Sequence, residues 1–184
     1  MNPLPHSDAA TPRIPLVVPT ETTGSLRAMF DTFERTRGNV PNLFRALAHR
    51  PPIVETLFAH LQAVTGPGTV PVALKEILVV RVSQLNGCAY CVASHTMLAK
   101  RAGATDDQIA RVGRGDYSEF EPGWAAALAF AAETVPVGGN VSDATFARLA
   151  GFWDAAQLVE ITATCTVFAH FNRIANALRI PVTR

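Results

Sequence analysis

The chain has 184 residues, of which 48% are hydrophobic and 17% charged, a composition typical of one folded domain rather than of a disordered segment. Sixteen Lys and Arg against 15 Asp and Glu leave a net charge of +1, so we expect no recruitment to nucleic acid. The longest apolar stretches fall short of the roughly 20 residues of a membrane helix, and the N-terminus has no secretory signal core. We therefore expect a cytoplasmic protein that makes no membrane contact.

The first 20 residues are rich in proline, and each proline removes a backbone donor and restricts the residue before it. The prolines in this stretch are Pro3, Pro5, Pro12, Pro15 and Pro19. We expect an extended N-terminal arm over residues 1–20 that packs on the body or on a neighbouring subunit. Residues 21–184 are then expected to form a single domain.

Helix start and stop signals punctuate the rest of the chain, with proline or a capping residue before several segments and glycine after several others. They predict helices over residues 25–37, from 41, over 51–65, over 72–86, over 88–102, from 105, over 122–135, from 142, and over 154–178. The segment 72–86 contains a β-branched run, but Leu74, Ile77 and Leu78 follow the helical period. We therefore predict an all-α fold.

Two cysteines and a histidine share one face of the helix predicted over 88–102. Cys88, Cys91 and His95 stand at i, i+3 and i+7, within about 60° of one another at 100° per residue. The imidazole can reach the Cys91 sulfur directly or through one water. Free N–H groups and the helix dipole favour an anion at this end of a helix, so we expect the pKa of both thiols to lie below about 8.5.

A carboxylate is expected near these sulfurs from the preceding helix. Glu76 stands 12 residues before Cys88, and a tight turn at Asn86-Gly87 would fold it back toward the cysteines. A buried Glu needs a partner, and His95 is the candidate. The set then comprises a base, a proton relay and two sulfurs, which points to thiol redox chemistry without a metal, flavin or haem.

The same residues suit two other uses. Two thiolates and an imidazole are zinc ligands, and the cysteines could also be inert buried thiols. The rival class is a non-catalytic, zinc-stabilised helical interaction module. The third cysteine, Cys165, lies in an apolar helix and is interpreted as a small core residue.

The sequence around these residues resembles a known family. Glu76 followed by LNGCAYCVASH is similar to the motif of the carboxymuconolactone decarboxylase and alkylhydroperoxidase D superfamily, specifically its peroxidase-related branch. The match covers about residues 70–103, and FNRIANALRIP is similar to the family's last helix. The resemblance implies an AhpD-like helical bundle with a CxxC helix-turn-helix core, assembled as a homo-oligomer, either a trimer or a hexamer.

The resemblance also implies an activity and a role for each residue. It implies a thiol-dependent peroxidase that reduces a hydroperoxide and is regenerated by a dithiol or lipoyl-type reductant. Cys91 would attack the peroxide, Cys88 would resolve the product, and Glu76 with His95 would relay protons. This chain has Ala89-Tyr90 between the cysteines where mycobacterial-type enzymes have a His, which leaves the relay one imidazole short. A carboxymuconolactone decarboxylase-like activity is the alternative, although that branch lacks the cysteine pair.

Overall fold

The computed structural model describes residues 11–136 and 138–183. Over these residues the chain forms nine α-helices, a short 3-10 turn at Pro19–Glu21 and no strand, so the predicted all-α fold is confirmed. The helices are α1 (Gly24–Arg37), α2 (Asn42–Leu47), α3 (Pro51–Thr65), α4 (Val72–Leu85), α5 (Ala89–Arg101), α6 (Asp106–Arg114), α7 (Pro122–Thr134), α8 (Asp143–Ala150) and α9 (Ala155–Leu178). None of the described helices is long and apolar enough to cross a membrane.

The helix boundaries follow the local signals closely. Proline is the first residue of α3 and α7, and Thr105 and Asp154 each form a capping box at the start of α6 and α9. Gly38 ends α1 in the left-handed conformation, with φ of 80°. Most predicted helix ends fall within one residue of the observed ends. The difference that matters for the site is that Cys88 is the N-cap of α5 and not a residue of its first turn.

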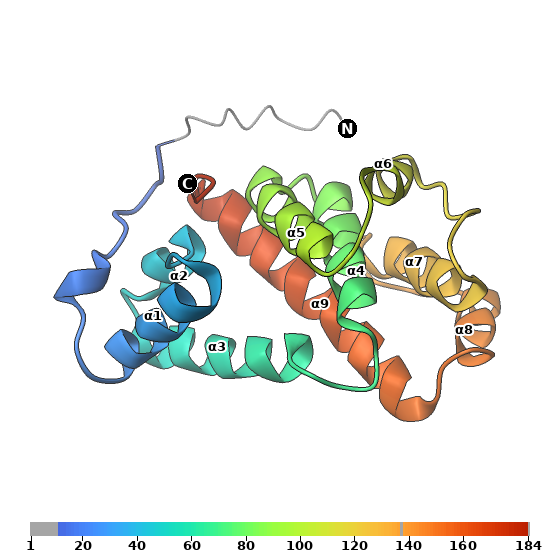
Figure 1. The fold of residues 1–184 in the computed structure, drawn as a ribbon, viewed down its shortest axis with the longest axis horizontal. Coiled ribbons are helices and arrows are strands. Elements are labelled where there is room, and N and C mark those ends of the chain that lie inside the picture. The colour runs from blue at the N-terminus through green and yellow to red at the C-terminus, as the bar shows by residue number, and fades with distance from the viewer. Residues whose placement is uncertain (1–10, 137, 184) are drawn as a thin grey trace.

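The centre of the molecule is formed by α4 and α9. Helix α9 is the longest and crosses the structure diagonally, with α1 to α3 at one end and α6 to α8 at the other (Figure 1). Helix α4 packs against α5, α6, α7 and α9. It is buried nearly all round, so its β-branched residues pack on every side as a core helix rather than forming a strand.

The described part of the proline-rich arm lies on the body of the same chain. Arg13 N–H donates to Leu178 O at 2.9 Å, and Val17 N–H donates to Arg45 O at 3.2 Å. His49 Nε2 donates to Pro15 O at 2.8 Å. Residues 11–17 therefore join α2 to the end of α9, whereas residues 1–10 of the expected arm lie outside the described residues.

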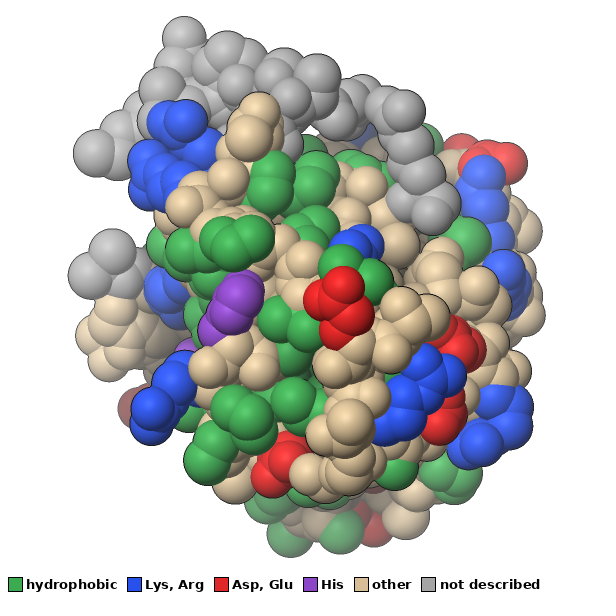
Figure 2. All heavy atoms as spheres, turned by 90° about the vertical axis from the view of Figure 1, so that its left-hand side faces the viewer, with side chains coloured by type: hydrophobic (Ala, Val, Ile, Leu, Met, Phe, Trp, Pro, Cys, Tyr) green, Lys and Arg blue, Asp and Glu red, His purple; other side chains and the backbone are tan. Residues whose placement is uncertain are grey.

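The surface at the end formed by the N-terminal helices is mixed in character. Acidic and basic side chains are interspersed there among apolar and uncharged ones (Figure 2). This distribution agrees with the near-zero net charge of the chain.

Candidate active site

The turn between α4 and α5 brings the four predicted site residues into one region. Gly87 adopts φ of 61°, which an L side chain disfavours, and the next residue donates its N–H to Ser83 O at 2.9 Å. Helix α5 then packs along α4. Glu76 on α4 consequently meets His95 on α5, beside Cys88 and Cys91.

Glu76 and His95 form a buried pair. Nδ1 of His95 donates a hydrogen bond to Oε2 of Glu76 at 2.7 Å. The imidazole packs edge-on against Phe168 of α9, with ring centroids 4.6 Å apart. Because the carboxylate accepts from Nδ1, Nε2 is the ring nitrogen left to accept or donate a proton.

The two site cysteines are free, buried thiols that interact with each other. The Cys91 N–H donates to the Cys88 sulfur at 3.4 Å. A hydrogen bond from the Cys91 thiol lowers the pKa of Cys88, and the same bond, with burial, raises the pKa of Cys91 well above its ordinary value. The lowered pKa expected for both thiols is therefore wrong for Cys91, because this thiol is the hydrogen-bond donor of the pair.

Asn172 of α9 completes the surroundings of the sulfurs and has no accessible surface. Its Nδ2 donates to Ser83 Oγ at 3.1 Å, and its Oδ1 accepts from Asn86 Nδ2 at 3.0 Å. Hydrogen bonding from Asn172 lowers the pKa of both site thiols. Sequence reasoning missed this residue because the contact comes from a helix far along the chain, and no local pattern marks it.

A small cavity lies beside Cys91 and His95. Its volume is about 30 Å³, and its wall is mainly apolar and aromatic, with Arg37 as its one permanently charged side chain among the described residues. This volume accommodates about two water-sized groups. Cys88 does not line the cavity, so a small molecule inside it meets Cys91 first.

Tyr90, between the two cysteines, also lines this cavity. Its hydroxyl accepts a hydrogen bond from Leu43 N–H at 3.3 Å, which ties α5 to α2. Burial raises the pKa of Tyr90 to about 12, so the phenol is protonated at neutral pH.

The other sequence candidates lie in different environments. Cys165 is fully buried in α9, and burial raises its pKa to about 12, in keeping with its interpretation as a core residue. Over residues 11–136 and 138–183, no three His, Cys, Asp or Glu side chains are arranged to hold a metal ion.

The part of the chain that contains the predicted site residues is similar to known proteins. Residues 51–133 match the model of the Carboxymuconolactone decarboxylase family, a stretch that contains all four predicted site residues. The uncharacterized protein YdfG of Bacillus subtilis is 30% identical over 106 residues, which are 56% of this chain and 72% of that protein. The chain belongs to the carboxymuconolactone decarboxylase family. The predicted family is thus confirmed.

Two solved structures have a similar fold. An uncharacterized peroxidase-related protein from Ralstonia eutropha, described as an alkylhydroperoxidase AhpD core, is 25% identical with a TM-score of 0.84, over 94% of this chain and 92% of that one. A peroxidase-related protein from Silicibacter sp. is 18% identical with a TM-score of 0.79, over 94% of both chains. The AhpD-like fold is therefore confirmed, and the family has peroxidase-related or decarboxylase-like roles.

Proposed function

We propose that the protein is a thiol peroxidase that reduces hydroperoxides through Cys91 and Cys88, with Glu76 and His95 as the proton relay. The observation that carries this proposal is the shared cavity of Cys91 and His95, whose imidazole is oriented by a buried carboxylate. Its volume of about 30 Å³ suits the two oxygen atoms of a hydroperoxide group.

The hydrogen bond between the sulfurs sets the order of proton movements. In the proposed cycle Cys88 loses its proton first, because its pKa is lowered, and Cys91 keeps its proton, because its pKa is raised. Transfer of that proton along the hydrogen bond makes Cys91 the thiolate and Cys88 the thiol. The sulfur at the cavity wall thereby becomes the nucleophile, since the thiolate is the reactive form.

The Cys91 thiolate then attacks the terminal oxygen of the hydroperoxide. A sulfur–oxygen bond forms, the O–O bond breaks, and the other oxygen leaves as an alkoxide. Protonated His95 supplies a proton from Nε2, so the products are an alcohol and the sulfenic acid of Cys91. Glu76 orients the ring and keeps the proton on Nδ1, so Nε2 is the nitrogen that gives up its proton.

Cys88 closes the oxidative half of the cycle. Its sulfur attacks the sulfenic acid, a disulfide forms between the two cysteines, and water leaves. An external dithiol, for which a lipoyl-type compound is the expected class, reduces this disulfide and becomes oxidised. Its two protons return to Cys91 and His95, which restores the resting site.

Stopped-flow measurement of hydroperoxide consumption with a panel of dithiols tests the activity. We expect saturable turnover, and mass spectrometry of the oxidised protein should show a loss of two hydrogens. Bound zinc in the native protein, with no turnover, would instead support the interaction-module alternative. Cys165→Ser serves as the matched control, because that thiol lies in the core.

Sulfenic-acid trapping in single Cys→Ser variants tests the assignment of the two sulfurs. We expect the trap on Cys91 when Cys88 is replaced, because only Cys91 lines the cavity. The assignment is wrong if Cys88 alone is trapped while Cys91→Ser reacts at the wild-type rate.

The homo-oligomer implied by the family resemblance stays a prediction. Two apolar side chains on α8 and α9, Phe146 and Val159, are 47% and 69% exposed and lie on the wall of an open groove. Light scattering at micromolar concentration should give a trimer or hexamer, and a 19.7 kDa species alone would contradict this prediction.

A further inference from the structure

Arg37, the last residue of α1, stands between two hollows. It lines the inner cavity beside Cys91 and His95, and it also lines a second hollow of about 90 Å³. Both hollows share Ser94 as well, and the second is bounded by more exposed residues such as Met97. A molecule in the outer hollow therefore contacts Arg37, the residue that also borders the cavity of Cys91.

The guanidinium of Arg37 has no counter-charge of its own within the described residues. The guanidinium lies over the ring of Phe33, with Cζ 5.9 Å from the ring centroid. By contrast, Arg27 on the same helix pairs with Asp31 at 2.5 Å. Against the effect of burial, the negative charge of Glu76 raises the pKa of Arg37, but this carboxylate is already hydrogen-bonded to His95.

Arg37 is a half-buried cation whose guanidinium forms no ion pair with a described residue. Burial lowers the pKa of Arg37, yet a guanidinium stays charged in proteins. A half-buried guanidinium carries five donors in a planar fork, and water or an anion must satisfy them. A carboxylate fits that fork with two parallel hydrogen bonds.

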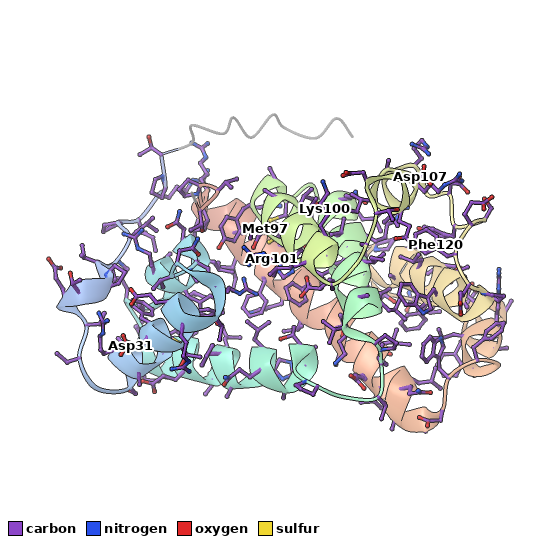
Figure 3. All side chains as sticks on the ribbon, viewed as in Figure 1. Asp31, Met97, Lys100, Arg101, Asp107 and Phe120 are labelled. Atoms are coloured by element: carbon purple, nitrogen blue, oxygen red, sulfur yellow. The ribbon has the colours of Figure 1, made fainter. Side chains whose placement is uncertain are left out.

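Arg101 adds positive charge to the same region. It lies on α5 one turn beyond Met97 (Figure 3). Its charge contributes to lowering the pKa of Arg37, so the two guanidiniums repel each other. The adjacent Lys100 is paired with Asp106, whereas no described residue forms an ion pair with Arg101.

We propose that Arg37 binds a carboxylate group of the substrate in the outer hollow while the hydroperoxide group enters the inner cavity. This inference rests on the proposed peroxidase function and deepens it, because it names the substrate class as a hydroperoxide that bears a carboxylate. The inner cavity holds only the reacting oxygens, so the hydrocarbon part next to them lies in the outer hollow, against apolar residues such as Pro41 and Met97. Arg101 strengthens the attraction without entering the wall of either hollow.

A binding measurement tests the anion site without any turnover. Hexanoate is titrated calorimetrically into the reduced protein, with uncharged hexanamide as the matched ligand. We expect hexanoate to bind more tightly than hexanamide, and Arg37→Gln to weaken hexanoate by about 10-fold or more, the usual effect of losing a charged hydrogen bond. Arg37→Lys, which keeps the charge and loses the planar fork, should fall in between.

Arg35→Gln is the control variant, because Arg35 is exposed on the same helix and its loss changes the net charge equally. It should keep its hexanoate affinity within about twofold. Unchanged affinity in Arg37→Gln, or an equal loss in Arg35→Gln, would overturn the proposal. If circular dichroism shows that Arg37→Gln does not fold, Arg37→Lys takes its place. The proposal is then overturned if Arg37→Lys keeps the full affinity for hexanoate and the wild type binds hexanoate no more tightly than hexanamide.

A kinetic arm separates this inference from the proposed function. The rate of Cys91 oxidation is measured with a hydroperoxy fatty acid and with its methyl ester. The ratio of acid to ester rates should fall by about 10-fold in Arg37→Gln. If neither compound oxidises the wild type while hexanoate binding depends on Arg37, the peroxidase fails and the anion site stands. If both oxidise Cys91 and the ratio is equal in wild type and variant, the peroxidase stands and the anion site fails.

Discussion

Lys75 and Glu76 are neighbours on α4, and each forms a buried ion pair, but the two pairs have different surroundings. The Lys75 ammonium contacts Glu160 of α9 and donates to Val64 O at 3.0 Å and Gly66 O at 2.9 Å. The other oxygen of Glu160 accepts from the N–H groups of Thr69 and Val70. The ammonium thus has three protein oxygens around it, two carbonyls and one carboxylate oxygen.

The pair of Glu76 and His95 is only partly closed. One imidazole nitrogen donates to the carboxylate, and the ring lines a cavity that also contains Cys91. A buried pair whose hydrogen-bonding groups all meet protein atoms can only hold elements together. A pair with one nitrogen free to face a cavity can also transfer a proton to or from a molecule there. The hydrogen-bonding state of that remaining nitrogen therefore distinguishes a pair suited to catalysis from a purely structural pair.

Breaking the closed pair should have the largest effect. Lys75→Met leaves the Glu160 carboxylate with no cation, and we expect a loss of about 3 kcal/mol in the free energy of unfolding, typical for a broken buried pair. Urea denaturation measures it. Lys100→Met, which removes an exposed pair with Asp106, is the control and should cost at most about 0.5 kcal/mol. Equal losses in the two variants would remove the distinction between closed and exposed pairs.

Breaking the partly closed pair of Glu76 and His95 should lower the rate of Cys91 oxidation more than it lowers the stability of the fold. Glu76→Gln and His95→Asn should each slow oxidation of Cys91 by a hydroperoxide about 100-fold, a typical share for positioned acid–base groups. Because the two residues act as one relay, the double variant should be little slower than either single variant. Stopped-flow oxidation rates across pH 6 to 9 measure this effect.

The exposed His170 provides the control for the relay, as His170→Asn removes an imidazole from the surface of α9. Far-ultraviolet circular dichroism must first show that Glu76→Gln folds. If the single variants fold and keep full thiol reactivity across that pH range, the pair of Glu76 and His95 has only a structural role.

The sulfur pair offers a test with an unexpected sign. The hydrogen bond with Cys88 raises the pKa of Cys91, so Cys88→Ala should lower that pKa and increase the thiolate fraction at pH 7. We expect alkylation of Cys91 by iodoacetamide to become faster, because the thiolate is the reactive form.

The reciprocal change should act in the opposite direction. The Cys91 thiol lowers the pKa of Cys88, so Cys91→Ala should move the titration of Cys88 to higher pH. Mass spectrometry distinguishes the alkylated sites, and Cys165 is protonated throughout because its pKa is about 12. Slower alkylation of Cys91 in Cys88→Ala would show that Cys88 does not act as the acceptor.

The smallest effect is expected at Tyr90, on the wall of the cavity. Tyr90→Phe leaves the buried N–H of Leu43 without its acceptor, which costs about 1 kcal/mol of unfolding free energy. Urea denaturation measures the difference, and an unchanged midpoint would mean that this hydrogen bond contributes nothing to the docking of α2 on α5.

Local sequence signals were sufficient to predict the helices and the central residues of the candidate site, Cys91 and His95. Proline, capping residues and glycine mark helix ends through local backbone chemistry, so the boundaries of α3, α6, α7 and α9 could be predicted. Helical spacing puts Cys91 and His95 on one face, and a glycine turn folds the preceding helix back onto it. These relations involve residues close in the chain, which leaves few alternatives.

The packing of the helices determines which residues from distant parts of the chain surround Cys91 and His95. Arg37, Phe168 and Asn172 belong to α1 and α9, and their positions depend on how these helices pack around α4 and α5. A hydrophobic pattern tells which face of a helix is buried but not which partner covers it. The direction of the pKa shift of Cys91 likewise depends on which sulfur donates to the other, and only the three-dimensional arrangement of the two thiols sets that.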